Sequence, residues 1–362
     1  MFGSSSVGFG QAAKQNYNPN NDVEVQTPPD LDGISSLTFS PVANHIIATS
    51  WNNFAYCWDI SPQGQAVPKA QLKDHQHPLL CSSWNQDGTQ VFTGGCDKTV
   101  RLWNLATNQS QQVAQHDAPI RHCFYAAPMN MLLTGGWDKT LRFWDCRSPT
   151  AANTQQLPER VYAMDVNYPL AVVATADRNI HIYNLQQPQA PFKTIASPLK
   201  WQTRCVTCFP DKTGFLISSI EGRVGVQQVA DDEASKAKNF TFKCHRGDSS
   251  ANDIFGVNAM NFHPVFGTFS TAGSDGTYNF WDKDSKQRLK QMAKATYGAN
   301  PAPIPCSAFN RDGTIFAYAV SYDWSRGYSE YNPQNMKSAI LLHPVKEEEV
   351  KPKPKAQTTG RK

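Results

Sequence analysis

The sequence has few charged residues and no long apolar run. Only 18% of its 362 residues are charged, and 34 basic against 30 acidic side chains give a formal net charge of +4. This small excess permits contact with nucleic acid without requiring it. No apolar stretch approaches the roughly 20 residues that cross a bilayer, and Met1–Ser6 lacks the basic and apolar regions of a signal peptide. We therefore expect a soluble, intracellular chain with no membrane partner.

Catalytic and metal-binding signatures are missing as well. None of the patterns GxSxG, GxxxxGK[ST] or HExxH occurs. The nine cysteines fit reduced thiols better than a disulfide framework. The single CxxC, Cys205 and Cys208, has no second pair and no histidines at zinc-ligand spacing. The sequence thus predicts no catalytic residue, no metal, no cofactor and no small-molecule substrate.

What the sequence does contain is a repeat. Thr93–Asn104 returns as Thr134–Asp145 and as Thr271–Asp282, each with an acid six positions before an aromatic residue and a threonine four positions before the acid. Weaker copies lie around Trp58, Tyr183 and Glu221, and a seventh is read from residues 304–342. The spacing of roughly 40 to 45 residues is the period of a propeller blade. We predict an all-β fold, a seven-bladed WD-repeat β-propeller with four-stranded antiparallel blades.

The two ends of the chain indicate how such a ring closes. Alternating apolar residues, as in Ile34–Phe39, and turn pairs such as Asp87-Gly88 are typical of short strands joined by hairpins. A strand over residues 22–25 can complete the last blade and cover its open edge. We predict a propeller over residues 21–345. The flanking segments, a Gly/Ser/Asn-rich one over 1–20 and a Lys/Pro/Glu tail over 346–362, are predicted to be disordered.

Each repeat carries residues that can hold its blade together. A turn aspartate can accept hydrogen bonds from turn amides and from a histidine that precedes the first strand. The strand threonine can hold that histidine and also meet the tryptophan indole. Because these residues recur in register with the repeat, we interpret them as structural rather than catalytic. The two assigned sets are His75, Thr93, Asp97, Trp103 and His116, Thr134, Asp138, Trp144.

One region outside the repeats combines basic and aromatic residues. Lys283, Lys286, Arg288, Lys290 and Lys294 follow Trp281 and Asp282. The segment 239–246 adds Phe240, Phe242, Lys243 and Arg246. If the two segments converge on one rim, they form a cationic groove with stacking faces of the kind that binds single-stranded nucleic acid. The alternative is a solvated charged face over ordinary core aromatics.

A second candidate surface lies at the turns. Trp51 and Trp137 stand just before their turn residues, where other repeats have small side chains, and we expect them to face solvent. Arg204 and Arg223 lie near the start and the turn of one blade, which predicts that they emerge on one face. Exposed tryptophan near arginine is typical of a protein-binding hot spot. The expected ligand is an acidic or aromatic peptide.

Several segments outside the generic repeat resemble one family. They are residues 157–164, 197–205, 219–224, 240–246, 273–284 and 322–325. Together they span about residues 20–345 and resemble the nuclear mRNA export factors of the RAE/GLE type. The resemblance implies a non-enzymatic adaptor of the nuclear pore in export of polyadenylated mRNA. It would be found in the nucleus and at the nuclear envelope, and also in the cytoplasm and on the mitotic spindle.

The resemblance also implies partners. These are the GLEBS motif, a short hairpin segment of an FG nucleoporin, and single-stranded RNA carried in ribonucleoprotein. The nucleic-acid groove would comprise Arg223, Phe242, Trp281, Asp282, Lys283, Lys286, Arg288 and Lys290, joined by Arg246 from the basic segment. The GLEBS-binding face would comprise Arg204 and Arg223, with Trp51 and Trp137 from the hot-spot pattern. At Lys286 and Arg288 only the charge matches the family.

Two other readings stay open. Mitotic checkpoint propellers of the BUB type share segments 221–224 and 242–246 and also bind GLEBS motifs, including that of a spindle-checkpoint kinase. The residues after Trp281 and the segment 322–325 argue against them. In addition, Trp144-Asp145-Cys146-Arg147 fits the WDxR pattern of substrate receptors that dock on a cullin-ligase adaptor.

Overall fold

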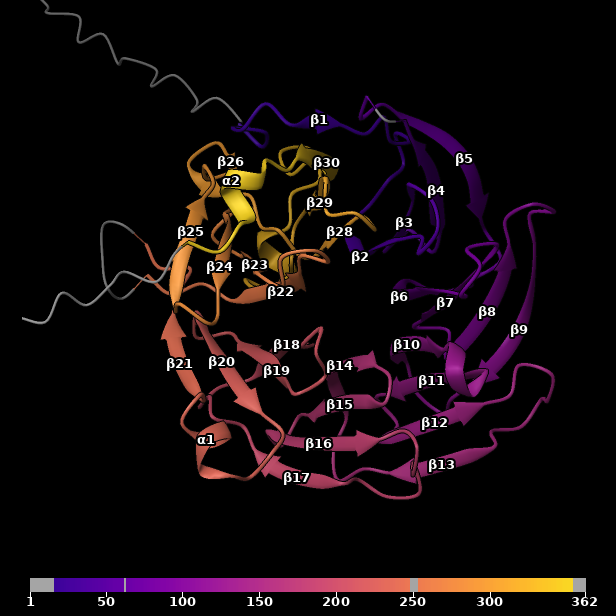
Figure 1. The fold of residues 1–362 in the computed structure, drawn as a ribbon. Helices are drawn as coiled ribbons and strands as arrows, with labels where there is room; N and C mark the ends of the chain where they lie inside the picture. Colours follow the sequence, from indigo (N-terminus) through magenta and orange to yellow (C-terminus); the bar gives the residue numbers. More distant parts are fainter. Residues whose placement is uncertain (1–15, 62, 248–252, 354–362) are drawn as a thin grey trace, which may run out of the picture.

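Seven four-stranded antiparallel sheets follow one another along the chain and close into a ring (Figure 1). Residues of the innermost strands line a central channel. The computed structural model describes residues 16–61, 63–247 and 253–353. In each of the first six blades, four consecutive strands pair in sequence order, from the channel outward. The predicted seven-bladed propeller is therefore confirmed.

The strands of the first six blades have the following bounds. Blade 1 holds β2 (Ile34–Phe39), β3 (His45–Ser50), β4 (Ala55–Ile60) and β5 (Ala66–Leu72), and blade 2 holds β6 (Leu79–Trp84), β7 (Gln90–Gly95), β8 (Thr99–Asn104) and β9 (Gln109–Gln115). Blade 3 holds β10 (Ile120–Ala126), β11 (Met131–Gly136), β12 (Thr140–Trp144) and β13 (Asn153–Gln156), and blade 4 holds β14 (Val161–Asn167), β15 (Leu170–Thr175), β16 (Asn179–Asn184) and β17 (Lys193–Ala196). Blade 5 holds β18 (Thr203–Cys208), β19 (Gly214–Ser219), β20 (Arg223–Gln228) and β21 (Phe240–Lys243), and blade 6 holds β22 (Val257–Phe262), β23 (Phe269–Gly273), β24 (Tyr278–Asp282) and β25 (Gln287–Gln291).

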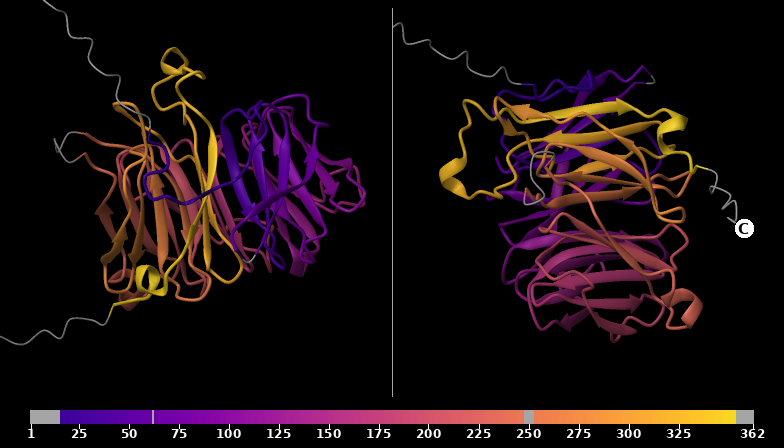
Figure 2. Two further views of the ribbon diagram at one scale, coloured as in Figure 1. Left: turned by 90° about the horizontal axis from the view of Figure 1, so that it is seen from above. Right: turned by 90° about the vertical axis from the view of Figure 1, so that its left-hand side faces the viewer.

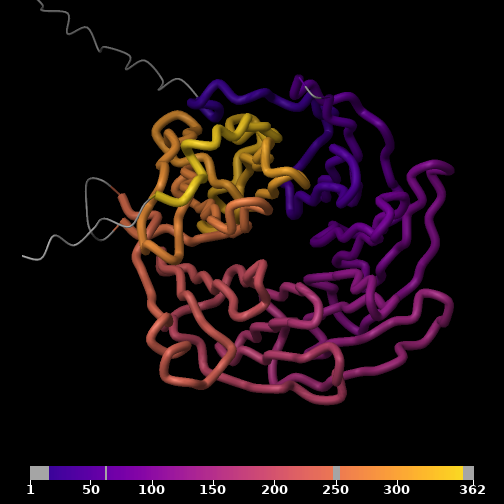
Figure 3. The backbone as a smooth tube through the Cα atoms, in the orientation of Figure 1, coloured from indigo at the N-terminus to yellow at the C-terminus, as the bar shows by residue number. Residues whose placement is uncertain are grey.

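Blade 7 joins the two ends of the chain. Its strands are β28 (Ser307–Phe309), β29 (Ile315–Val320), β30 (Ala339–Pro344) and, at the outside, the N-terminal β1 (Val23–Glu24). Val23 lies opposite Leu342 in this pairing. Figure 3 shows the N-terminal segment running beside the C-terminal one. β1 therefore covers the middle of the β30 edge, where the Val25 amide also donates to the Ile340 carbonyl at 2.9 Å.

Short elements complete the fold. They are β26 (Thr296–Tyr297), β27 (Asn300–Pro301), the 3-10 turns η1 (Ala127–Met129) and η2 (Tyr328–Glu330), and the single-turn helices α1 (Glu233–Lys236) and α2 (Glu347–Val350). No helix in the ranges that the structure describes is long and apolar enough to cross a membrane. We call the face that carries the turns between second and third strands the top face. The long β29–β30 connection with η2 stands out from it, whereas α2 lies at the bottom face (Figure 2).

A register shift recurs in the inner strands. In blades 1 to 6 the first and third residues of the inner strand pair with the neighbouring strand, and the second residue is skipped. Such bulges redirect a side chain. The skipped residues are Ser35, Leu80, Arg121, Tyr162, Arg204 and Asn258. All but Tyr162 line the central channel, near its top end.

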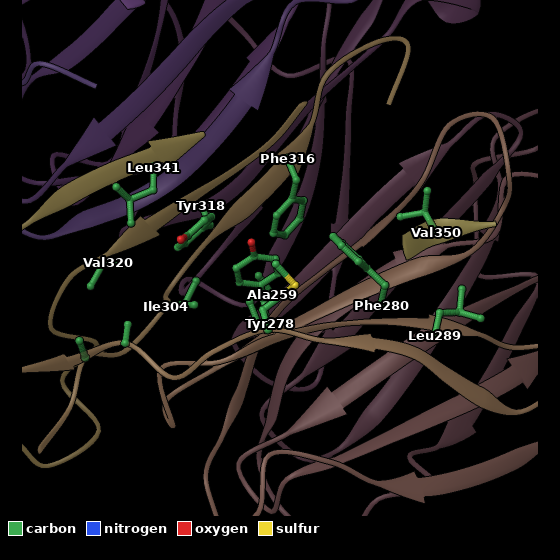
Figure 4. Close-up of a cluster of buried hydrophobic side chains, with 14 of the residues drawn as sticks. Ala259, Tyr278, Phe280, Leu289, Ile304, Phe316, Tyr318, Val320, Leu341 and Val350 are labelled. Carbon is green, nitrogen blue, oxygen red and sulfur yellow. The ribbon is translucent and has the colours of Figure 1, made fainter. Parts of the chain in front are cut away.

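The apolar core lies between neighbouring blades. Between blades 6 and 7, Tyr278 and Phe280 pack against Phe316, with ring centroids 5.0 and 5.5 Å apart (Figure 4). Burying each such ring contributes roughly 1.5–3 kcal/mol. Val350 from α2 joins the same cluster and is 1% exposed.

The ends of the chain differ from the prediction. The predicted disordered tail over 346–362 is wrong for its first part, because Glu349 and Val350 are buried in α2. Likewise, within the predicted segment 1–20, Asn16 pairs with Thr296 and Asn18 bonds to the backbone of Asp22. These hydrogen bonds hold part of the polar segment against the propeller. The predictions for 1–15 and 354–362 lie outside the described residues.

Candidate partner and nucleic-acid interfaces

The blade 3 residues form one chain of hydrogen bonds. The Trp144 indole donates to Thr134 Oγ1 at 2.7 Å, and this oxygen lies 2.7 Å from His116 Nε2. His116 Nδ1 lies 2.9 Å from Asp138 Oδ2. An indole can only donate, so Thr134 accepts from Trp144. The lowered pKa of Asp138 keeps its carboxylate ionised, so that it accepts the Nδ1 proton of His116. Every group in the chain is satisfied, as a structural role requires.

Blade 2 departs from the predicted set at its tryptophan. His75 lies 2.6 Å from Asp97 and 2.8 Å from Thr93, as in blade 3. The Trp103 indole, however, donates to Asn108 Oδ1 at 3.0 Å instead of to Thr93. Asn108 sits in the next turn with a φ of 53°, and there its side chain offers a nearer acceptor. Trp103 therefore does not belong to the network.

Blade 6 has a full network that sequence reasoning missed. His245 lies 2.8 Å from Asp275 and 2.9 Å from Thr271, which accepts from the Trp281 indole at 2.9 Å. The histidine stands 30 positions before its acid, against 22 in blades 2 and 3. Because a longer loop separates His245 from Asp275, the spacing found in blades 2 and 3 did not predict this pair, and His245 was assigned to the basic segment.

The predicted basic and aromatic segments do converge between blades 5 and 6. We call Phe209, Phe240, Phe242, Trp281, Lys283, Lys286 and Arg288 the aromatic–cation cluster. The Phe242 and Trp281 rings are 4.8 Å apart and bridge the two blades. Three cations cover rings in it: Lys283 lies 5.2 Å from Phe209, Lys286 4.7 Å from Phe240 and Arg288 5.8 Å from Trp281. Contacts of this kind contribute about 0.5–1 kcal/mol at exposed sites.

The turn between β24 and β25 positions these cations. Asp282 is buried and accepts from the Asp284 amide at 2.9 Å and the Ser285 hydroxyl at 2.6 Å. Lys286 takes a φ of 57°, which turns the chain back into β25. Asp282 is thus the anchor of the turn and is not available to a ligand. Lys286 and Arg288 are exposed, whereas the Lys283 side chain is 14% exposed and pairs with Asp284.

The structure separates the other predicted groove residues from the cluster. Arg223 pairs in register with Lys243, and since side chains alternate along a strand, both lie on the opposite sheet face from Phe242. Arg246 donates to the Glu221 carbonyl at 2.8 Å on the top face. Lys290 lies 3.9 Å from Glu349 of α2. The predicted single groove is therefore wrong in its extent.

The predicted GLEBS-binding face is also divided. Arg204 lines the central channel and donates twice to Asn258 Oδ1, at 2.8 and 3.1 Å. Trp51 and Trp137 are half-buried, which corrects the expectation that they face solvent. Trp51 packs on Trp324 with ring centroids 5.6 Å apart. The long blade 7 connection supplies this cover.

That connection builds an aromatic site that sequence reasoning did not find. The Trp324 ring lies 5.0 Å from Tyr331 and 5.4 Å from Tyr322. Tyr331 donates to Asp32 at 2.9 Å, and a surface pocket beside it lies between residues 24–32 and 331–338. Only the segment 322–325 pointed to this region, through the resemblance.

The WDxR segment ends at the bottom face. The Arg147 side chain is 80% exposed and pairs with Asp145 at 2.6 Å. The hydrogen bond from Arg147 lowers the pKa of Asp145 to about 2. Both groups are therefore charged at neutral pH and already paired with each other.

Comparisons with known proteins agree with this architecture. The family described as WD domain, G-beta repeat matches residues 25–59, 66–104 and 108–145. Protein RAE1 of Arabidopsis thaliana is 54% identical over 358 residues, covering 98% of this chain and 99% of that protein. The mRNA export factor of Xenopus tropicalis is 48% identical over 360 residues, which cover 96% of this chain and 95% of that protein. The Poly(A)+ RNA export protein of Schizosaccharomyces pombe is 47% identical over 338 residues, which cover 92% of this chain and 93% of that protein.

These relatives span the whole propeller, including the segments outside the generic repeat. The likeness therefore covers the blade 5–6 cluster and the long blade 7 connection as well as the blade networks. With the seven-bladed ring, it shows that the chain belongs to the RAE1 family of WD-repeat mRNA export factors.

Proposed function

We propose that this protein is a non-enzymatic adaptor of the nuclear pore in export of polyadenylated mRNA. It binds single-stranded RNA at the aromatic–cation cluster and an acidic GLEBS segment of an FG nucleoporin on its top face. The names of the relatives at 47–54% identity support the export role. The expected locations are the nucleus and the nuclear rim.

The convergence of the aromatic–cation cluster is the observation that carries the RNA proposal. Exposed Lys286 and Arg288 lie over rings of two neighbouring blades. Phosphate oxygens can pair with these cations while bases contact the aromatic edges, a combination that tolerates any sequence. The blade core fixes the rings, because Phe242 and Trp281 pack against buried residues of blades 5 and 6. The surface is therefore preformed.

Replacing Lys283, Lys286 and Arg288 together with alanine should weaken binding of single-stranded RNA by about tenfold or more at low salt. Loss of the phosphate contacts of exposed Lys286 and Arg288 should also reduce the slope of log affinity against log salt by about 1.4. Fluorescence anisotropy over a salt series measures both quantities. The matched control removes the same charge elsewhere by replacing exposed Lys73, Lys98 and Arg311. If both triple variants lose affinity equally, RNA responds to net charge and the cluster is not its site.

The top face of blade 5 supports the proposed peptide site. Trp201 is 60% exposed and Ile220 is 41% exposed. The two are held together because the Ile220 amide donates to the Gln202 carbonyl at 3.1 Å. Arg223 begins the strand after this turn. An apolar pair beside arginine is the hot-spot pattern that the sequence had placed at Trp51 and Trp137.

Reversing Arg223 to glutamate should weaken binding of an acidic GLEBS peptide by about tenfold to a hundredfold. Calorimetry with the full chain measures the change, and circular dichroism checks that the variant stays folded. Lys98→Glu makes the same charge reversal in the corresponding turn of blade 2 and should bind normally. Unchanged affinity in Arg223→Glu would remove this site. A tagged protein found only at kinetochores would favour the checkpoint reading.

A further inference from the structure

The top end of the central channel has an unusual charge balance. A cavity of about 210 Å³ is lined there by the bulge residues Ser35, Leu80, Arg121, Arg204 and Asn258. The register shift in each inner strand brings these side chains to one level. Two of them are arginines, which come from blades 3 and 5. Both guanidinium groups therefore lie within one polar cavity.

In the ranges that the structure describes, no carboxylate pairs with Arg121. Its hydrogen bond to the Leu80 carbonyl is 3.4 Å long, beyond the usual 2.7–3.2 Å. Arg204 is better placed, since it donates to Asn258, which in turn donates to Asp323 at 3.0 Å. The guanidinium of Arg121 thus keeps donors that no protein group uses well.

Nothing else in the cavity lining offsets this charge. Its one carboxyl group, Asp165, already accepts the Cys208 amide at 2.6 Å, and burial raises the pKa of Asp165. Burial, and then the charge of Arg121, lower the pKa of His122 well below its usual value, so that it is neutral. Burial, and then Arg204, also lower the pKa of Arg121. A partly buried cation of this kind is costly unless an anion accompanies it.

The cavity has room for such an anion. At ~30 Å³ per water molecule, its volume corresponds to about seven waters. Serine and threonine hydroxyls, including those of Ser36, Thr38 and Ser82, add further donors to the lining. Planar guanidinium groups bind phosphate oxygens through paired N–H bonds.

We propose that the top of the central channel binds a phosphate-class oxyanion between Arg121 and Arg204. The anion accepts hydrogen bonds from both arginines and so joins the inner strands of blades 3 and 5 across the channel. This site is independent of the proposed RNA and GLEBS surfaces. A free phosphate compound and the terminal phosphate of a nucleic acid share the required chemistry.

Binding of inorganic pyrophosphate to the full chain tests the site. Pyrophosphate should raise the melting temperature above that in sodium chloride of equal ionic strength, and calorimetry should give a saturable isotherm. Arg121→Gln should raise the dissociation constant about tenfold or more, since it removes one paired contact. Arg178→Gln removes the same charge from an exposed top-face turn and should bind normally. The aromatic–cation triple variant should also bind normally.

The same variant gives an independent readout without ligand. In chloride buffer Arg121→Gln should be as stable as the parent chain or more stable, because it removes a cation without a partner. Oligonucleotides with 5′-phosphate or 5′-hydroxyl ends, added in competition with pyrophosphate, then identify the source of the anion. Competition by the phosphorylated oligonucleotide alone assigns the site to a nucleic-acid end. No competition assigns it to a free phosphate compound. A pyrophosphate effect that chloride reproduces, or that Arg121→Gln retains in full, would overturn the proposal.

Discussion

Replacing Asp275 with alanine should lower the free energy of unfolding by about 3–5 kcal/mol. Asp275 is 6% exposed and accepts from His245 at 2.8 Å and from the amide and hydroxyl of Thr277 at 3.0 and 2.9 Å. Its removal leaves three buried donors unsatisfied. It also removes the terminal acceptor from the series of hydrogen bonds that links His245, Thr271 and Trp281. Urea denaturation followed by tryptophan fluorescence measures the loss.

Asp177 provides the matched control in blade 4. It stands at the corresponding turn, but it is exposed and bonds to Thr175 and Asn179 with no histidine. Asp177→Ala should therefore cost only about 0.5–1.5 kcal/mol. Equal losses of unfolding free energy in both variants would mean that the hydrogen bonds through His245 do not stabilise the blade 6 turn.

The blade 6 network also has a pH signature. Burial by itself would raise the pKa of Asp275, but the charge of His245 and its hydrogen bond hold this pKa below the usual value. An acid with a lowered folded pKa stabilises the protein above its unfolded pKa of about 3.9. That contribution is lost as the pH falls towards the folded value. Asp275→Ala should therefore lose less stability than the parent chain on acidification.

The repeat made the fold readable from the sequence. An acid six positions before an aromatic residue marks the turns of blades 2, 3, 4 and 6, and the steps between Asp97, Asp138 and Asp177 gave the period directly. The weaker copies kept the spacing although their residues differ. Closure by the N-terminal strand followed from the need to cover an edge. Turn residues that recur at a fixed spacing are therefore sufficient to predict a propeller from the sequence.

Positions that depend on three-dimensional context were not predictable in this way. His245 was missed because an extended loop changed its distance from Asp275. Arg204 was expected to share one face with Arg223, because the bulge that turns it into the channel leaves no mark in the residue types. Trp51 was expected to be exposed because the segment that covers it lies in blade 7. Each error concerns a contact between distant parts of the chain.

The closure of the ring contains a second buried network. His343 of β30 lies 2.8 Å from Asp22, just before β1, and 2.9 Å from Glu349 of α2. Tyr318 donates to the other oxygen of Asp22 at 2.7 Å. All four side chains are buried. A single histidine thus holds both terminal segments of the described chain against blade 7.

Replacing His343 with leucine should lower the free energy of unfolding by about 3–5 kcal/mol. The change leaves two buried carboxyl groups without their shared partner. Amide hydrogen exchange should rise in β1 and α2 before it rises in blade 3. An equal rise in exchange in β1, α2 and blade 3 would show that His343 does not specifically hold the terminal segments against blade 7.

The pH dependence of this network has the opposite sign to that of Asp275. Burial would lower the pKa of His343, but hydrogen bonds to Asp22 and Glu349 outweigh it and raise the pKa to about 9. A raised folded pKa gives stability that is complete below the unfolded value of 6.5 and is lost as the pH rises through about 9. The difference corresponds to about 3 kcal/mol.

Urea denaturation between pH 6 and 10 should show this loss in the parent chain and not in His343→Leu. His263→Gln is the control, since burial lowers the pKa of His263 and its ring bonds to backbone groups. That variant should keep the loss of stability above pH 6.5. A parent chain whose stability stays constant up to pH 10 would show that His343 is neutral when folded and does not compensate the two buried carboxyl groups.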